Sequence, residues 1–238
     1  MILHIPHSAI KFPDSIKFLK CIEEDLLRMT DWHTDDLFSH EASEIIMFKY
    51  SRLFCDVERF IVNEPMEEKG HGICYTIDSF GGPLRNISHE EREHILNHYY
   101  IPHHKELNKK CNLSLELYHK VVIVDCHSFS DEPLPHEFDQ DVNRPHFCIG
   151  MNEFHTPVEL INSIKNYLEK KEFITHVNNP FSGTIVPILH YNVTNNLKSI
   201  MIEVNRKLYL DRPAEEYSYI NNIIYNVLDI IKKYEANS

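Results

Sequence analysis

The chain has 238 residues, of which 24 are basic and 36 are acidic, so its formal net charge is −12. With 42% hydrophobic and 11% aromatic residues, it can bury a sizeable core without disulfides or structural metals. The length suits one domain spanning residues 1–238. A chain with this net negative charge is not expected to carry the basic surface that binds nucleic acids and anionic lipids. No uncharged run is long enough to span a bilayer. We therefore expect neither a nucleic acid nor a membrane as partner.

Three further features of composition bear on location and chemistry. The N-terminus has no basic residue before its apolar ones and reaches Pro6 at once, which predicts a buried strand, not a signal peptide, and a cytoplasmic protein. The six cysteines form no C-x-x-C pair and are expected to be reduced thiols. The 17 histidines are an excess. Because histidine is the commonest metal ligand and proton shuttle, this excess favours a metal or acid–base site, although most histidines are expected to be solvated or capping.

The first half of the chain alternates apolar runs of strand length with stretches of helical periodicity. In chain order we expect a strand at Ile2–Ile5, a helix over Ser15–Met29 capped by Asp14 or Ser15, and a helix starting at Thr34-Asp35-Asp36 with Thr34 as its cap. A strand at Leu53–Asp56 and a long loop over 63–86 follow. A loop of that length is usually functional or mobile.

The second half continues the alternation. Ser88-His-Glu-Glu91 matches a capping box, which predicts a long helix bent near Pro102. The uniformly β-branched run Val121–Val124 is typical of a strand covered on both faces. The remaining expected elements are a helix over Pro157–Lys171, strands at Phe173–Val177 and Ser199–Val204, and a helix over Pro213–Tyr234. This alternation predicts an α/β fold, a single domain with a mixed, mostly parallel central sheet flanked by helices.

Polar side chains follow three of the predicted strands. His7 follows the first strand, His127 follows the run 121–126, and Glu203 lies near the end of the strand 199–204. Ligands of such sheets bind beyond the carboxyl ends of the strands. His7, His127 and one carboxylate from the segment 31–35 could hold zinc and leave one position open for water. The alternative is that both histidines are structural, one bonded to backbone and one satisfied in the core.

Glu203 strengthens the hydrolase hypothesis. It interrupts the apolar run Ile200-Met-Ile-Glu-Val, where a carboxylate is costly to bury unless it is paired or functional. A glutamate beside a zinc site is the general base that metal-assisted hydrolysis needs. The alternative is an ion pair with Arg206 or Arg59.

Eight motifs occur in a familiar order. They are His4-Ile-Pro-His7-Ser, Thr30-Asp-Trp-His33-Thr-Asp35, Ser51-Arg-Leu-Phe-Cys-Asp56-Val-Glu-Arg59-Phe, Gly70-His-Gly72-Ile-Cys-Tyr75, Pro102-His-His104-Lys-Glu-Leu, Asp125-Cys-His127-Ser, Asn179-Pro-Phe-Ser-Gly183 and Ile202-Glu203-Val-Asn-Arg206-Lys-Leu-Tyr209. Together they resemble the N-formylglutamate amidohydrolase family over nearly the whole chain. The resemblance implies a zinc-dependent hydrolase that converts N-formyl-L-glutamate to formate and glutamate in histidine breakdown, on a fold similar to the zinc carboxypeptidases.

The resemblance also implies roles for individual residues. His7 and His127 correspond to metal ligands, and Glu203 to the general base. In the zinc carboxypeptidases an acidic ligand stands three residues after the first histidine, but that position is Ile10 here. We choose Asp31 as the third ligand because it lies in the loop just before Thr34. His33 and Asp35 are the other candidates.

A free acylated dicarboxylate needs cations to hold its carboxylates. Arg59 and Arg52 are the expected pair, because a guanidinium presents a fork that matches a carboxylate, and Asp56 would orient them. The alternative for this pair is a structural ion pair. Further candidate substrate contacts are Arg144, Arg206 and Gly183. Two other functions stay open with the same fold: a zinc hydrolase of another N-acyl amino acid or peptide, and a catalytically silent protein that binds small acids. The oligomeric state is not predicted.

Overall fold

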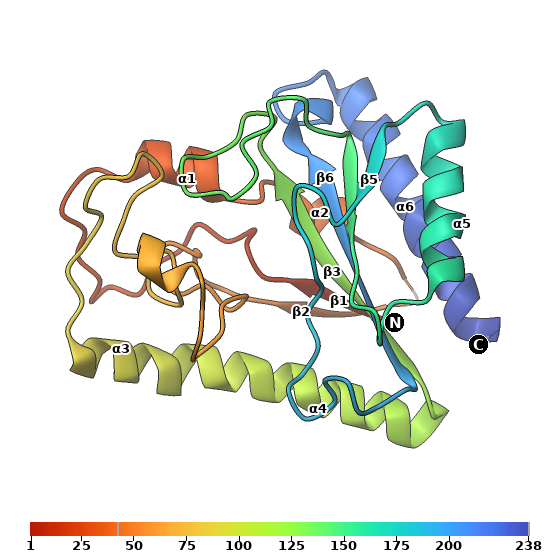
Figure 1. The fold of residues 1–238 in the computed structure, drawn as a ribbon, viewed down its shortest axis with the longest axis horizontal. Coiled ribbons are helices and arrows are strands. Elements are labelled where there is room, and N and C mark those ends of the chain that lie inside the picture. Colours follow the sequence, from red (N-terminus) through yellow and green to blue (C-terminus); the bar gives the residue numbers. More distant parts are fainter. Residues whose placement is uncertain (42, 238) are drawn as a thin grey trace.

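A six-stranded sheet forms the centre of the computed structural model (Figure 1). The strands are β1 (Ile2–Ile5), β2 (Glu44–Met47), β3 (Val121–Phe129), β4 (Phe147–Gly150), β5 (Thr175–Val177) and β6 (Leu197–Asn205). Their order is β2-β1-β3-β6-β4-β5, and only the β4–β6 pairing is antiparallel. The structure describes residues 1–41 and 43–237; Ala42 and Ser238 lie inside the predicted domain but outside the described residues.

Helices cover both faces of this sheet, and two further helices, α1 and α3, pack beside it. The helices are α1 (Glu23–Met29), α2 (Thr34–Leu37), α3 (His89–Ile95), α4 (Ile101–Tyr118), α5 (Val158–Lys170) and α6 (Ala214–Asn237), with 3-10 turns at Glu67–Lys69 and Arg206–Leu208. The prediction of a single α/β domain with a mixed, mostly parallel sheet is confirmed. No helix in the described part of the chain is both long and apolar enough to cross a membrane.

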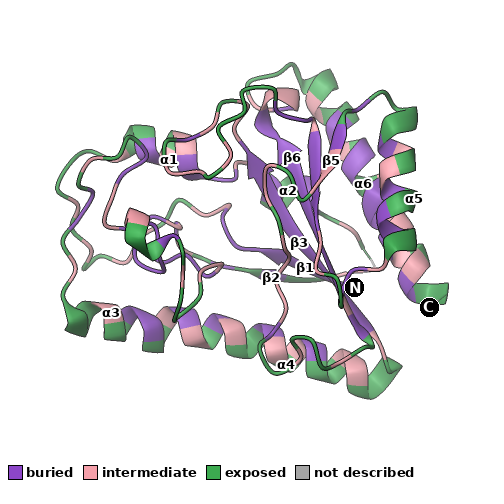
Figure 2. Ribbon diagram, viewed as in Figure 1, coloured by how far each residue is buried: buried purple, intermediate pink, exposed green. Residues whose placement is uncertain are grey.

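The core lies on the two faces of the sheet. Helices α2, α5 and α6 pack on one face against the largest cluster of buried apolar side chains, and α4 packs on the other against a smaller one. Strands β1, β3, β4 and β6 are almost entirely buried, the edge strand β2 is mostly exposed, and α5 and α6 bury one side and expose the other (Figure 2). A strand covered on both faces reads as an apolar run, which is why Ile2–Ile5 and Val121–Val124 were identifiable.

Strand alternation decides where the polar residues point. Successive side chains of a strand face opposite sides of the sheet. On β3, Val121 and Ile123 pack in the cluster beside α4, so Asp125 and His127 share that face. The same alternation on β6 places Glu203 on the face of Leu197. The face covered by α4 therefore carries the polar residues at its carboxyl end.

Two predicted elements differ from the structure. The predicted helix Ser15–Met29 is wrong in its first half, since α1 begins only at Glu23, with Ile22 as its cap in place of Asp14 or Ser15. Ile16 and Phe18 pack in different apolar clusters, so they do not share one helical face. The predicted strand Leu53–Asp56 is also wrong. This segment is a turn closed by the bond from Phe54 N to Ser51 O, and its apolar side chains pack without a strand partner.

Three other local predictions can be compared directly. The capping box at Ser88 is confirmed, with its side chain accepting from Glu91 N. The long helix is interrupted by a π-helical turn at Leu96–Tyr100, immediately before Pro102. Thr34 is the first residue of α2 and not its cap, because His33 takes the cap position in the left-handed conformation. The loop over 63–86 holds neither a strand nor an α-helix; it contains the short 3-10 turn and an isolated antiparallel bridge between Ile77 and Pro83.

Candidate active site

Three of the predicted ligands meet at the carboxyl end of the sheet. One potential ligand atom from each of His7, Asp31 and His127 lies within 4.8 Å of the other two. Asp31 Oδ2 is 3.1 Å from His127 Nδ1 and 3.6 Å from His7 Nδ1. All three side chains are buried. The loop between α1 and α2 is held against the end of β1 by the bond from Asp31 N to His7 O, and this bond brings the carboxylate to the histidines.

Each histidine uses its other nitrogen to reach a second carboxylate. His7 Nε2 donates to Asp56 Oδ1 at 2.8 Å, and His127 Nε2 donates to Asp125 Oδ1 at 3.1 Å. Histidines that bind metals usually donate their remaining N–H to a carboxylate, which fixes the ring and makes it a stronger ligand. Both rings therefore present Nδ1 to the shared space.

The donor set fits a zinc ion. Two imidazoles and one carboxylate are the ligands that catalytic zinc sites use. His7 Nδ1 is buried, and no residue of the described chain hydrogen-bonds to it. Burying such a group without a partner costs free energy. A bound metal ion would supply the missing partner for His7 Nδ1. The residues that would hold the ion are His7, Asp31 and His127.

The ionisation of Asp31 agrees with this fit. Burial alone disfavours the charged form, but the bond with His127 and the nearby imidazole of His7 lower the pKa of Asp31 below its ordinary value. Asp31 also lies 3.8 Å from Arg52 Nη1 and 3.9 Å from Arg206 Nη1. The carboxylate is therefore held ionised, in the form that binds metals.

Glu203 lies beside this cluster. It is the register partner of His127 on the neighbouring strand and is 6% exposed. Its Oε2 is buried without a hydrogen-bond partner among the described residues. Burial raises the pKa of Glu203 to about 8, against the opposing effect of the His127 charge. The carboxylate is thus free of the ion pair with Arg206 or Arg59 that the sequence left open, since no such pair is found in the described chain.

Asp56 organises the two predicted arginines. Its Oδ2 lies 3.0 Å from Arg52 Nη2 and 3.6 Å from Arg59 Nε, and it accepts from the Tyr75 hydroxyl at 2.5 Å. Burial opposes its ionisation, but Arg59, His7 and Arg52 hold the pKa of Asp56 well below its usual range. The carboxylate therefore links His7 to the two arginines.

The other predicted site residues lie as follows. The cavity that His7, Asp31 and His127 line is also lined by Arg52, Arg59, Arg206 and Gly183. Arg206 uses both terminal nitrogens on the backbone carbonyls of residues 30 and 28. Arg144 is not among the described residues that line the cavity; it pairs with Glu137 and bonds to Ser130 O. His33 and Asp35 are exposed, and neither belongs to a potential metal-binding group of the described residues.

A histidine network behind the cluster was not predicted. His4 Nδ1 lies 2.9 Å from Asp125 Oδ1 and 3.1 Å from Glu58 Oε1, and these three residues form a second group with metal-binding composition. His4 Nε2 lies 2.8 Å from His103 Nε2 on α4. Burial opposes protonation, but the bonds to Asp125 and Glu58 raise the pKa of His4 to about 9. Burial, with the charge of His4, lowers the pKa of His103 to about 2. A protonated His4 therefore donates to both sides.

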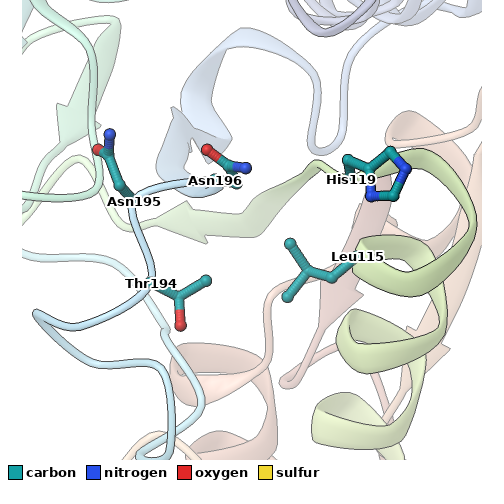
Figure 3. Close-up of a pocket in the computed structure, with 5 residues that line it drawn as sticks. All are labelled: Leu115, His119, Thr194, Asn195 and Asn196. Carbon is teal, nitrogen blue, oxygen red and sulfur yellow. The ribbon is translucent and has the colours of Figure 1, made fainter.

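The cluster opens into a large cavity of about 1050 Å³. A second hollow of about 400 Å³ lies at the opposite edge of the sheet, where β3 and β6 begin. It lies between the end of α4, which carries Leu115 and His119, and the segment that carries Thr194, Asn195 and Asn196 (Figure 3). None of the predicted site residues lines this second hollow, so the large cavity is the candidate active site.

Comparison with known proteins assigns the family. A family model described as N-formylglutamate amidohydrolase matches residues 1–210. The chain belongs to the N-formylglutamate amidohydrolase family. The match includes all three potential metal ligands and Glu203.

Individual known proteins resemble the chain over most of its length. An N-formylglutamate deformylase from Pseudomonas putida is 21% identical over 243 residues, which cover 98% of this chain and 90% of that protein. The crystal structure of an N-formylglutamate amidohydrolase from Ralstonia eutropha JMP134 superposes with a TM-score of 0.84 at 17% identity, covering 99% of this chain and 94% of that one. A protein from Agrobacterium tumefaciens superposes with a TM-score of 0.70 at 16% identity, covering 97% and 91%. At these identities the structural likeness establishes the shared fold.

Proposed function

We propose that this chain is a zinc-dependent amidohydrolase that cleaves the amide bond of N-formyl-L-glutamate, or of a related N-acyl amino acid, to give formate or the corresponding acid and the free amino acid. Glu203 carries the proposal, because its carboxylate is buried beside the three potential metal ligands and its Oε2 has no hydrogen-bond partner among residues 1–41 and 43–237. The family and the deformylase from Pseudomonas putida support the choice of substrate.

The chain's own residues account for the proton transfers. When bound, zinc supplies a Lewis acid that polarises a carbonyl and lowers the pKa of water. Glu203 takes a proton from the attacking water as the new C–O bond forms, and returns it to the nitrogen as the C–N bond breaks. Asp56 and Asp125 hold the rings of His7 and His127 in place during both steps.

Arg52 is the best placed residue to bind a substrate carboxylate. Its Nη2 is held by Asp56 and its Nε by the Tyr75 hydroxyl, while the partner found for Nη1 among the described residues is Asp31, at 3.8 Å. The guanidinium lines the cavity, so its free edge is available to a ligand. A charge-assisted bond from arginine would fix the amino acid part of the substrate.

The decisive experiment replaces Glu203 and keeps the metal. We expect Glu203→Gln to retain zinc and to lower kcat on N-formyl-L-glutamate by about 10²- to 10⁴-fold, the usual contribution of a general acid–base group. Glu203→Asp, which keeps a carboxylate, should retain more activity than Glu203→Gln. Normal turnover by zinc-loaded Glu203→Gln would contradict the proposal. Binding of N-formylglutamate by the zinc-loaded wild type with no turnover would identify a silent binding protein instead.

Two wider attributes follow from the family resemblance and the sequence. A role in histidine breakdown and a cytoplasmic location stay predictions. Both require tests in the source cell, such as growth on histidine after deletion of the gene and fractionation of the tagged protein.

A further inference from the structure

The mouth of the active-site cavity carries an unusual set of exposed apolar side chains. They come from three separate segments and are Phe60, Ile61, Val62, Phe138, Ile188 and Leu189, which we name the apolar rim. Their exposed fractions run from 46% to 83%. Large apolar side chains that gather on one exposed surface usually mark a binding site. The apolar rim and the three potential metal ligands, His7, Asp31 and His127, line the same cavity.

The rim is held in place by bonds on each of its segments. In the first segment, the carboxylate of Glu64 accepts from the backbone N–H of Phe60 and Met66, and Tyr100 Oη donates to Arg59 O at 2.6 Å. In the second, Lys69 Nζ donates to His136 O at 2.7 Å.

The third segment is tied to the sheet. Ile185 N donates to Asp125 Oδ2 at 3.0 Å, and the Ser199 hydroxyl donates to Ile185 O at 2.7 Å. The apolar side chains are therefore displayed by anchored backbone. Such preorganisation lowers the entropic cost of binding a ligand.

The size of the cavity exceeds what formylglutamate needs. Cavities of about 300–1,000 Å³ accommodate drug-sized ligands, and this one is about 1050 Å³. Under the proposed function, Arg52 binds the amino acid part, and the carbonyl lies near His7, Asp31 and His127. In formylglutamate the carbonyl carbon bears only a hydrogen on its other side. Formylglutamate therefore has no acyl substituent that could contact the rim.

We propose that the chain hydrolyses N-acyl derivatives of acidic amino acids whose acyl group is an apolar chain or ring larger than formyl, and that the apolar rim binds this acyl group. This inference rests on the proposed function and specifies its substrate class. Contact between the acyl group and the rim removes apolar surface from water on both sides, which favours the larger substrate. The reaction is unchanged: water adds to the acyl carbon, the C–N bond breaks, and a carboxylic acid and a free amine result.

The test compares kcat/KM of the zinc-loaded enzyme on N-formyl-, N-acetyl-, N-hexanoyl- and N-benzoyl-L-glutamate. We expect the hexanoyl or benzoyl substrate to exceed the formyl substrate by about tenfold or more. Phe60→Ser and Ile188→Ser should each reduce this ratio by about three- to tenfold, because each removes part of the apolar contact. Phe80→Ser and Val158→Ser are matched controls, since both residues are exposed and neither lines the cavity. The controls should leave the ratio unchanged.

The outcomes separate the two proposals. Cleavage of formylglutamate alone would leave the proposed function intact and overturn this inference. The inference is also wrong if the rim variants lower kcat/KM equally for all four substrates, because the rim would then not contact the acyl group specifically. It is wrong as well if N-formyl-L-phenylalanine is preferred to every N-acyl-glutamate. Failure to cleave any of these compounds with zinc bound would overturn the proposed function itself.

Discussion

His127 and Glu203 are register partners on the adjacent parallel strands β3 and β6. Neighbouring strands lie about 4.8 Å apart, and paired side chains point to the same face. The sheet therefore fixes the distance between a potential metal ligand and the proposed general base without help from any loop. The loop between α1 and α2 adds the third potential ligand, Asp31. Loop residues within 57–66, 130–139 and 180–191 also line the cavity.

The contact between His7 and Asp56 predicts a loss of metal affinity in Asp56→Asn. The substitution removes the negative charge that accepts a hydrogen bond from His7 Nε2 at 2.8 Å. Loss of such a partner typically lowers metal affinity by about 10- to 100-fold. Competition with a chromogenic chelator measures the change. Asp25→Asn is the matched control, because Asp25 is equally buried but accepts from Ser79, away from the cavity. Equal zinc affinities in the two variants would contradict a positioning role for Asp56.

Arg52→Lys tests the substrate contact. Lysine cannot reproduce the fork of arginine, so we expect KM for N-formyl-L-glutamate to rise by about 10-fold or more, the cost of one charge-assisted bond. Arg85→Lys serves as the control. Arg85 is also buried, but it bonds to the carbonyls of Tyr75 and Phe54 and does not line the cavity. Steady-state kinetics of both variants decide the matter, and an unchanged KM in Arg52→Lys would remove Arg52 from the binding site.

Gly150 permits a close approach that shapes the cavity. A Cβ at this position would lie 2.2 Å from the Gly183 carbonyl oxygen and 2.4 Å from Met201 Cε. We expect Gly150→Ala to displace the Gly183 segment and to lower kcat/KM by about tenfold or more, since small misplacements near a reacting centre are costly. Gly82→Ala, outside the cavity, should leave kcat/KM near the wild-type value. Wild-type kinetics in Gly150→Ala would show that the Gly183 segment does not position the substrate.

The histidine network predicts how stability depends on pH in the metal-free protein. The folded-state pKa of His4 is about 9, above its ordinary value of 6.5. Its contribution to stability is therefore fully present below pH 6.5 and is lost as the pH rises through 9. Burial also raises the pKa of Glu203 to about 8, above its ordinary value of 4.5. The folded protein therefore binds the Glu203 proton more tightly than the unfolded chain does, and the stability that this gives is lost as the pH rises through 8. The free energy of unfolding should thus fall between pH 6.5 and pH 9.

Denaturant titrations in chelator can assign part of that slope to His4. We expect His4→Gln to make the slope shallower by on the order of 1 kcal/mol per pH unit, the linkage expected for one proton. The slope is compared, not the absolute stability, because the variant also loses the bond to His103. An identical slope in wild type and His4→Gln would mean that His4 is not protonated in the folded state.

Some of the site was predictable because it follows strand geometry. The apolar run before Asp125-Cys-His127 identifies β3, and the spacing of two residues puts Asp125 and His127 on one face. The same reasoning located Glu203. The strands β2 (Glu-Ile-Ile-Met) and β4 (Phe-Cys-Ile-Gly) were not predicted from the sequence.

Other parts of the site depend on contacts that no local pattern encodes. Most histidines were expected to be solvated or capping, yet His103 is buried against His4, 99 positions away. The packing of α4 across the sheet creates that contact. Likewise, Asp56 was predicted to orient the arginines, but its bond to His7 joins two loops that only the folded chain brings together.

Metal content tests the central claim most directly. We would purify the wild type and His127→Ala without added metal and measure zinc by plasma mass spectrometry, then repeat the measurement after adding zinc and dialysing. The account predicts about one zinc per wild-type chain and a large loss in His127→Ala, because a three-ligand site does not survive the loss of a ligand. A wild type that holds no zinc before or after addition would contradict a zinc site at His7, Asp31 and His127.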